Sequence, residues 1–196
     1  MAMPNLSHDL TGKLLIAMPG MEDPRFAGAV IFLCVHSPSR AMGLIVNKPM
    51  EEVTFAELME QLDIPKQGST PGPVPQVPVC FGGPVEMRRG FVLHSPDYAP
   101  RGEEALRIDP RFAMTGTLDI LEDIASGRGP MRSLLALGYA GWGEGQLEAE
   151  IARNDWLTAD ATPDLVFDQK MERKWDAAVQ SLGINPLMLS SEAGHA

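Results

Sequence analysis

The chain has 196 residues, of which 44% are hydrophobic, and its 26 acidic and 16 basic residues give a formal net charge of -10. This composition is typical of a globular protein, and we expect residues 1–196 to form one domain with a sizeable core. The acidic balance disfavours direct binding to nucleic acid or to an anionic membrane surface, because both require clustered Lys and Arg, and the longest basic cluster is Arg88-Arg89.

The sequence also argues against a membrane segment, a metal site or a bound cofactor. No stretch approaches the ~18 apolar residues of a membrane span, and the first ten residues lack a signal-peptide pattern. The two cysteines, Cys34 and Cys80, lie in apolar runs outside any CxxC pair, which fits buried thiols in a reducing compartment. A disulfide between them stays open. We therefore expect a cytoplasmic protein that holds no metal or cofactor.

The first half of the chain predicts three strands and a helix. Residues 13–18 form an apolar run, and residues 29–36 form a longer one that is apolar on both faces, as in a central covered strand. Residues 43–47 return after a turn, which predicts a hairpin. Thr54 and Glu57 have the spacing of a capping box, so a helix is expected to begin there.

Prolines are concentrated in one segment that follows the predicted helix at Thr54. Five of them fall within residues 65–78, which predicts an exposed insertion loop within one domain. Glycines join two further predicted strands, 79–81 and 90–94. Beyond these we predict strands at 106–109, 133–139 and 165–167, and a glycine loop at 141–145. Helices are predicted to begin at Thr117, at Gln146 and near Met171. In the helix at Thr117 we expect Leu118, Leu121 and Ile124 to face inward.

Cys34 and His36 form the first candidate reactive pair. Alternate residues of a regular strand point to the same face, about 7 Å apart. A nearby imidazolium lowers the pKa of a thiol and makes it a nucleophile or a redox sensor. The alternative interpretation, which we favour, is a buried core cysteine and a histidine at the end of the strand.

Residues 138–146 form a glycine-rich segment between a predicted strand and a predicted helix. This context can cradle a phosphate on backbone N–H groups, so anion or nucleotide binding is one hypothesis. The segment lacks a Gly-Lys-Ser/Thr or GxGxxG pattern, and it carries Glu144 and Glu148. We favour a tight connection in which Trp142 plugs the core or lines a groove.

A third motif joins Gly82-Gly83-Pro84 to His94. Backbone N–H groups at the glycines could form an oxyanion hole, and His94 could act as a base. The chain has no Gly-x-Ser-x-Gly nucleophile motif. We therefore interpret these glycines as turn residues.

Several segments together resemble one bacterial family, called YqgE or AlgH. The resemblance covers nearly the whole chain except residues 65–78, and one difference is Val35, where the family often has a polar or acidic residue. The matching segments are 10–19, Asp23-Pro24-x-Phe26, Met42 to Pro49, Phe81 to Val85, Arg89 to His94, Leu137 to Glu148 and Gly194-His195-Ala196.

The resemblance implies an α+β fold with a bent or split mixed β-sheet flanked by about four helices, and a cytosolic location. It implies no established activity, although some members are described as transcriptional regulators linked to alginate production. The net charge of -10 argues against direct DNA contact as the mechanism.

Our leading hypothesis is a non-enzymatic binding or regulatory protein that acts through a partner protein or a small molecule. The motifs are rich in glycine and form no complete set of catalytic residues. We expect one contact surface formed by Gly82, Gly83, Arg89, His94, Gly141, Trp142 and Gly143. The alternatives are a thiol-based function at Cys34 and His36 and anion or nucleotide binding at residues 138–146.

Overall fold

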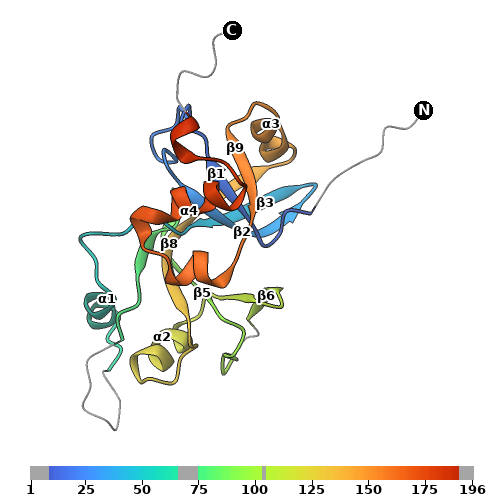
Figure 1. The fold of residues 1–196 in the computed structure, drawn as a ribbon. Coiled ribbons are helices and arrows are strands. Elements are labelled where there is room, and N and C mark those ends of the chain that lie inside the picture. Colours follow the sequence, from blue (N-terminus) through green and yellow to red (C-terminus); the bar gives the residue numbers. More distant parts are fainter. Residues whose placement is uncertain (1–8, 66–74, 103–104, 190–196) are drawn as a thin grey trace.

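The computed structural model describes residues 9–65, 75–102 and 105–189. It confirms the expected α+β class with a bent mixed sheet (Figure 1). Most of the predicted insertion 65–78 and the closing residues Gly194 to Ala196 lie outside the described residues. The strands are β1 (Lys13–Ala17), β2 (Val30–Ser37), β3 (Arg40–Ile45), β4 (Val79–Phe81), β5 (Val85–His94), β6 (Leu106–Asp109), β7 (Phe112–Thr115), β8 (Ser133–Gly143) and β9 (Trp156–Asp160).

Strand β8 holds the sheet together, because its two halves pair with different strands. The sheet order is β6-β7-β5-β8-β3-β2-β1-β9, and β4 also pairs with β8. The first half of β8 lies between antiparallel β5 and parallel β4, whereas residues 140–143 pair with β3. Strands β4 and β3 therefore pair with successive parts of β8, β4 with residues 135–137 and β3 with residues 140–143. The sheet divides into two halves at this change of partner.

Helices cover both halves of this sheet (Figure 1). Helix α4 packs on β1, β2 and β9, whereas α3 packs on β8 and β9. The predicted capping box is present, since the Thr54 hydroxyl accepts from the Glu57 N–H at 3.2 Å and the Glu57 carboxylate accepts from the Thr54 N–H at 2.8 Å. The α-helices are α1 (Phe55–Gln61), α2 (Leu118–Ala125), α3 (Gln146–Ala152) and α4 (Lys174–Ser181).

Alternation along β1 divides its side chains between two of the three apolar cores found among the described residues, and these two lie on opposite faces of the sheet. In β1, Leu14 and Ile16 lie in the core under α4, whereas Leu15 and Ala17 lie in the core under α3. All four side chains are buried, as expected of a strand that is covered on both faces.

Several predicted elements are corrected by the structure. Residues 165–167 form part of a π-helix (Asp164–Asp168) rather than a strand, and Leu118 is 57% exposed rather than inward-facing. Residues 141–143 belong to β8, so the predicted glycine loop is reduced to the turn before α3. Strands β7 and β9, of four and five residues, were not predicted.

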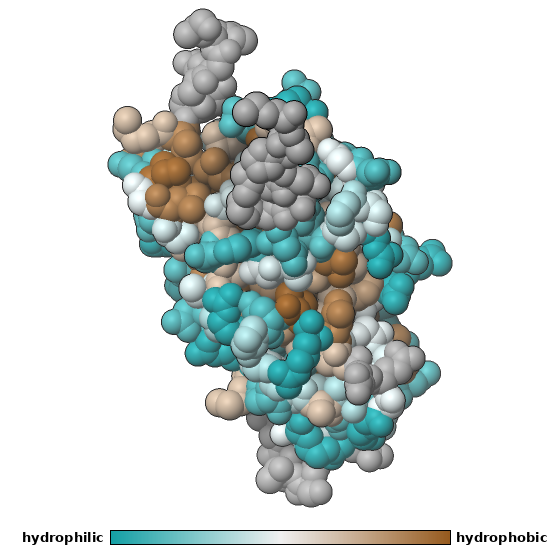
Figure 2. All heavy atoms as spheres, turned by 90° about the vertical axis from the view of Figure 1, so that its right-hand side faces the viewer, coloured by the Kyte–Doolittle hydropathy of each residue, from teal (hydrophilic) through white to brown (hydrophobic). Residues whose placement is uncertain are grey.

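On the face of the molecule shown in Figure 2, exposed apolar residues gather in separate patches between hydrophilic ones. Across the described ranges, no helix has the length and apolar character needed to cross a bilayer.

Candidate functional site

The two glycine motifs meet where the chain after β4 crosses β8. The Gly82 N–H donates to the Leu137 carbonyl oxygen at 2.8 Å. A Cβ on Gly82 would lie 2.3 Å from the Gly138 carbonyl oxygen, and a Cβ on Gly83 would lie 2.1 Å from the Tyr139 carbonyl carbon. Only glycine permits backbones to approach this closely. The contact therefore has a structural role, and the Gly82 N–H is not free to bind an oxyanion.

Trp142, near the end of β8, is fixed by a carboxylate on α3. Its indole N–H donates to Glu150 Oε2 at 2.9 Å, and the indole N–H of Trp156 donates to the same oxygen at 2.9 Å. The Gln146 amide donates to Glu150 Oε1 at 3.0 Å. Gln146 and Glu150 are four residues apart, so they lie on one face of α3. The two indoles meet edge to face with ring centres 6.1 Å apart.

Three of the predicted surface residues, Arg89, Gly141 and Trp142, line one cavity of about 440 Å³. The Arg89 guanidinium lies 5.0 Å from the centre of the Phe91 ring and 3.6 Å from the Glu86 carboxylate. We call this the β3–β5 cavity, and its apolar wall includes Val35, Met42, Phe91, Met114 and Tyr139, while Arg40 also lines it.

A bulge in β5 borders this cavity. Val85 pairs with Tyr139 and Gly90 pairs with Leu137, so β8 has one residue where β5 has the four residues 86–89. These four residues, which we call the β5 bulge, are exposed. The β5 bulge interrupts the pairing between β5 and β8. Bulges of this kind change the direction of the side chains that they carry.

A second apolar cavity, of about 260 Å³, lies beside the same bulge, with Arg88 and Arg89 in its wall. We call it the α1–α2 cavity, because its leucines come mainly from these helices and include Leu58, Leu62, Leu118 and Leu121. Within the described parts of the chain, Arg88 and Arg40 form no ion pair. The bulge therefore places Arg88, unpaired among the described residues, at the α1–α2 cavity, and it places Arg89, which is paired with Glu86, in the wall of both cavities.

His94 does not belong to the predicted surface, which corrects that expectation. Its side chain is fully buried, with Nδ1 2.7 Å from the Ser95 carbonyl oxygen and Nε2 2.9 Å from the Thr115 hydroxyl. Burial lowers the pKa of His94 below its usual value. His94 pairs with Ser133 at the start of β8, eight residues before Gly141, a separation of about 26 Å along a strand.

A second bulge separates Cys34 from His36. The register between β2 and β3 shifts between Leu33 and Val35, which places an extra residue at Cys34. Cys34 therefore lies in the core under α4, whereas His36 pairs with Ala41, a member of the core under α3, and so lies on the opposite face of the sheet.

The contacts of the two side chains agree with this separation. Cys34 Sγ contacts the Phe32 carbonyl oxygen at 3.8 Å, and burial raises the pKa of the thiol. His36 Nε2 lies 2.9 Å from Glu148, and Nδ1 accepts from the Leu10 N–H at 3.1 Å. The expectation that both side chains share one face of a strand is wrong, and the geometry does not favour imidazole activation of the thiol.

The segment 138–146 presents few free donors to an anion. The Gly143 N–H donates to Gln146 Oε1 at 3.1 Å, and Gly143 lies on the exposed end of β8. Helix α3 has seven residues and carries Glu148 in its first turn. A negative charge at a helix N-terminus opposes anion binding.

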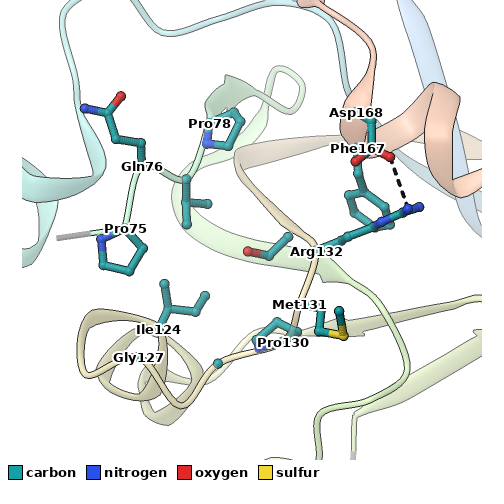
Figure 3. Close-up of a pocket in the computed structure, with 13 residues that line it drawn as sticks. Pro75, Gln76, Pro78, Ile124, Gly127, Pro130, Met131, Arg132, Phe167 and Asp168 are labelled. Carbon is teal, nitrogen blue, oxygen red and sulfur yellow. Dashed lines mark ion pairs between the residues drawn. The ribbon is translucent and has the colours of Figure 1, made fainter. Parts of the chain in front are cut away.

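A separate cleft of about 440 Å³ lies at the other end of β8 (Figure 3). Pro75 and Pro78 face Ile124 and Pro130 across it. Arg132, the one cation among the described residues that line it, already forms ion pairs with Asp164 at 3.0 Å and Asp168 at 3.2 Å. None of the predicted site residues lines this cleft.

Sequence reasoning missed a buried lysine, Lys174 in α4. Its ammonium donates to the carbonyl oxygens of Val46 at 2.9 Å and Val166 at 2.6 Å. Burial lowers the pKa of Lys174 to about 8, and the pKa of the nearby Cys80 thiol is raised to about 12. The available signal was helical spacing, since Lys174 lies four residues before the buried Ala178. Both cysteines are free thiols.

No group of three or more His, Cys, Asp and Glu side chains is arranged to hold a metal ion in the described part of the chain.

Comparison with known proteins places the chain in a family. The sequence model of the AlgH-like family matches residues 14–187. A UPF0301 protein of Jannaschia sp. (strain CCS1) is 90% identical over 196 residues, covering 100% of both chains. A UPF0301 protein of Ruegeria pomeroyi is 60% identical over 188 residues, which are 96% of this chain and 100% of the relative.

Two solved structures share the fold. The solution structure of the AlgH protein from Pseudomonas aeruginosa has a TM-score of 0.73 and 40% identity, covering 100% of this chain and 99% of that one. The crystal structure of a Corynebacterium diphtheriae protein has a TM-score of 0.68 and 22% identity, covering 92% and 89%, and shows the fold alone. Since the family model and these relatives span nearly its whole length, the chain belongs to the AlgH-like family.

Proposed function

We propose that this chain is a non-enzymatic binding protein that contacts a partner protein through the β5 bulge and the two cavities beside it. The observation that carries the proposal is that Arg89 lines both apolar cavities and that Arg88, next to it in the bulge, lines the α1–α2 cavity. A protein interface combines apolar pockets with arginines in this way.

Exposed apolar side chains around the bulge support a macromolecular partner. Met87 in the bulge is 58% exposed, Leu118 is 57% exposed and Leu62 is 40% exposed. Large apolar side chains gathered beside pockets on a protein surface are typical of interaction sites.

The charge of the surface supports a partner segment that carries acidic residues. The chain has a net charge of -10, yet Arg40, Arg88 and Arg89 line these cavities with Glu86 as the acidic residue among them. A segment whose apolar side chains are flanked by Asp and Glu would match this surface, and complementary charge would speed its association. Any regulatory effect on transcription would then act through the partner, because the overall charge opposes contact with DNA.

The experiment is site-specific photocrosslinking in a bacterium that carries this protein. A benzophenone amino acid replaces Met87, and a second variant carries it at Met131, which is 88% exposed in a different region. We expect a defined crosslinked protein from position 87, lost in the Arg88→Glu and Leu118→Asp variants and kept in the Arg107→Glu control. The proposal would be contradicted if positions 87 and 131 gave the same crosslinked proteins, or if the Arg88→Glu substitution left crosslinking from position 87 unchanged.

A further inference from the structure

A third cavity lies on the other side of Trp142, and its size suits a small molecule. It measures about 750 Å³, within the range of ligand pockets, and we call it the indole cavity. Phe26, Trp142 and Trp156 line it. The Phe26 and Trp156 rings meet edge to face at 5.8 Å, so the three aromatic side chains form one connected cluster.

The aromatic cluster is held in place before any ligand arrives. Both indole N–H groups donate to Glu150 Oε2, which fixes the planes of the Trp142 and Trp156 rings. Preorganised aromatic surfaces bind with a smaller entropic cost than mobile ones.

The charged groups around the indole cavity leave a negative excess. Its two cations are already paired, since Arg25 bonds Asp23 at 2.6 Å and Arg153 bonds Asp155 at 2.9 Å. Two more carboxylates, Glu22 and Glu150, also line the cavity, and neither forms an ion pair in the described part of the chain. The hydrogen bonds to Glu150 come from neutral indole and amide groups, so its negative charge is not cancelled.

Aromatic faces beside uncompensated carboxylates favour organic cations. Ammonium groups are attracted to the faces of Trp and Phe, and quaternary ammonium ions are recognised in this way. The cavity already contains one such contact, since the Arg25 guanidinium lies 5.7 Å from the centre of the Phe26 ring.

We propose that the indole cavity binds a small organic ammonium ion, with its apolar substituents against Trp142 and Trp156 and its charge near Glu22 and Glu150. This site adjoins the proposed partner surface, because Val85, Gly141 and Trp142 line both the indole cavity and the β3–β5 cavity. The two proposals are tested separately, because Met87 lines neither of these two cavities.

The test titrates the protein with choline and with 3,3-dimethyl-1-butanol, which has the same shape without the charge. Indole N–H signals in nitrogen-15 NMR spectra give the readout, because the three tryptophans provide three separate probes. We expect choline to shift the Trp142 and Trp156 signals in a saturable way. The Trp175 signal should stay unchanged, since its N–H donates to the Ala17 carbonyl outside the cavity at 2.9 Å.

Two variants locate the charge that attracts the cation. Glu22→Gln changes an exposed side chain and should weaken choline binding about twofold, whereas Glu150→Gln should weaken it about fivefold or more. Glu144→Gln, a control outside the cavity wall, should bind as the parent does. Equal binding of the neutral alcohol, absence of choline shifts at Trp142 and Trp156, or unchanged affinity in the Glu22→Gln and Glu150→Gln double variant would overturn the proposal.

Discussion

The Lys174 ammonium donates to the Val46 carbonyl oxygen, 128 residues earlier in the chain, inside the core under α4. Val46 follows β3 directly, and the second acceptor, Val166, lies in the π-helix. One side chain therefore joins α4 to the sheet and to the segment that precedes the helix. A charged group in this position makes stability depend on pH.

We predict that the free energy of unfolding contains a contribution from Lys174 that rises between pH 8 and pH 10.5. The folded pKa is about 8, against 10.5 for an exposed lysine, so in this window the unfolded chain binds the extra proton. The full rise would be about 3 kcal/mol. Because the two buried thiols lower stability in the same range, urea unfolding should show the Lys174 contribution as a difference between the parent and Lys174→Met that grows with pH, while a Lys170→Met control should keep the profile of the parent. Parallel pH profiles for all three proteins would refute the assignment.

A Cβ at Gly83 should be far more damaging than one at Gly143. The Gly83→Ala methyl group would collide with the backbone of Tyr139 at 2.1 Å, and Gly83 also has a φ of 153°. We expect a loss of about 3 kcal/mol or more, since backbone atoms cannot rearrange locally. Gly143→Ala meets no heavy atom within 4 Å and should change stability by about 0.5 kcal/mol or less. Thermal and urea unfolding measure both, and similar losses would contradict the crossing geometry.

Both thiols should be unreactive in the native protein. Cys34 and Cys80 are buried, and burial raises the pKa of each, to about 12 for Cys80. A disulfide-exchange reagent at pH 8 should therefore label neither until denaturant is added, when both of the chain's two cysteines should react. Rapid native labelling that disappears in Cys34→Ser would instead support the thiol-based alternative.

Mild acid should destabilise the protein partly through His94. Burial lowers its folded pKa below 6.5, so as the pH falls through this value the unfolded chain takes up a proton that the folded chain does not. The free energy of unfolding should decrease from pH 7 to pH 5 more steeply in the parent than in His94→Gln. An NMR titration of the imidazole checks the same point directly, and a folded pKa at or above 6.5 would contradict it.

Local sequence patterns were sufficient for the elements whose signals lie within one segment. The capping box at Thr54 and Glu57 could be predicted because its hydrogen bonds join residues three positions apart. The apolar run of β2 could be predicted because the strand is buried on both faces. The same patterns failed for residues 165–167, where Pro163 and two aspartates begin and end a π-helix. Short apolar runs of this kind do not distinguish a strand from a buried helical turn.

The net charge of -10, the preference for buried thiols and the resemblance to a family follow from the sequence by itself. Only the tertiary structure decided which side chains meet. A one-residue bulge moved His36 to the face opposite Cys34, and a four-residue bulge brought Arg89 into the wall of two cavities. Strand register depends on pairing between distant segments, and a shift of one residue reverses the face of every side chain that follows. No local spacing rule could therefore have placed these residues.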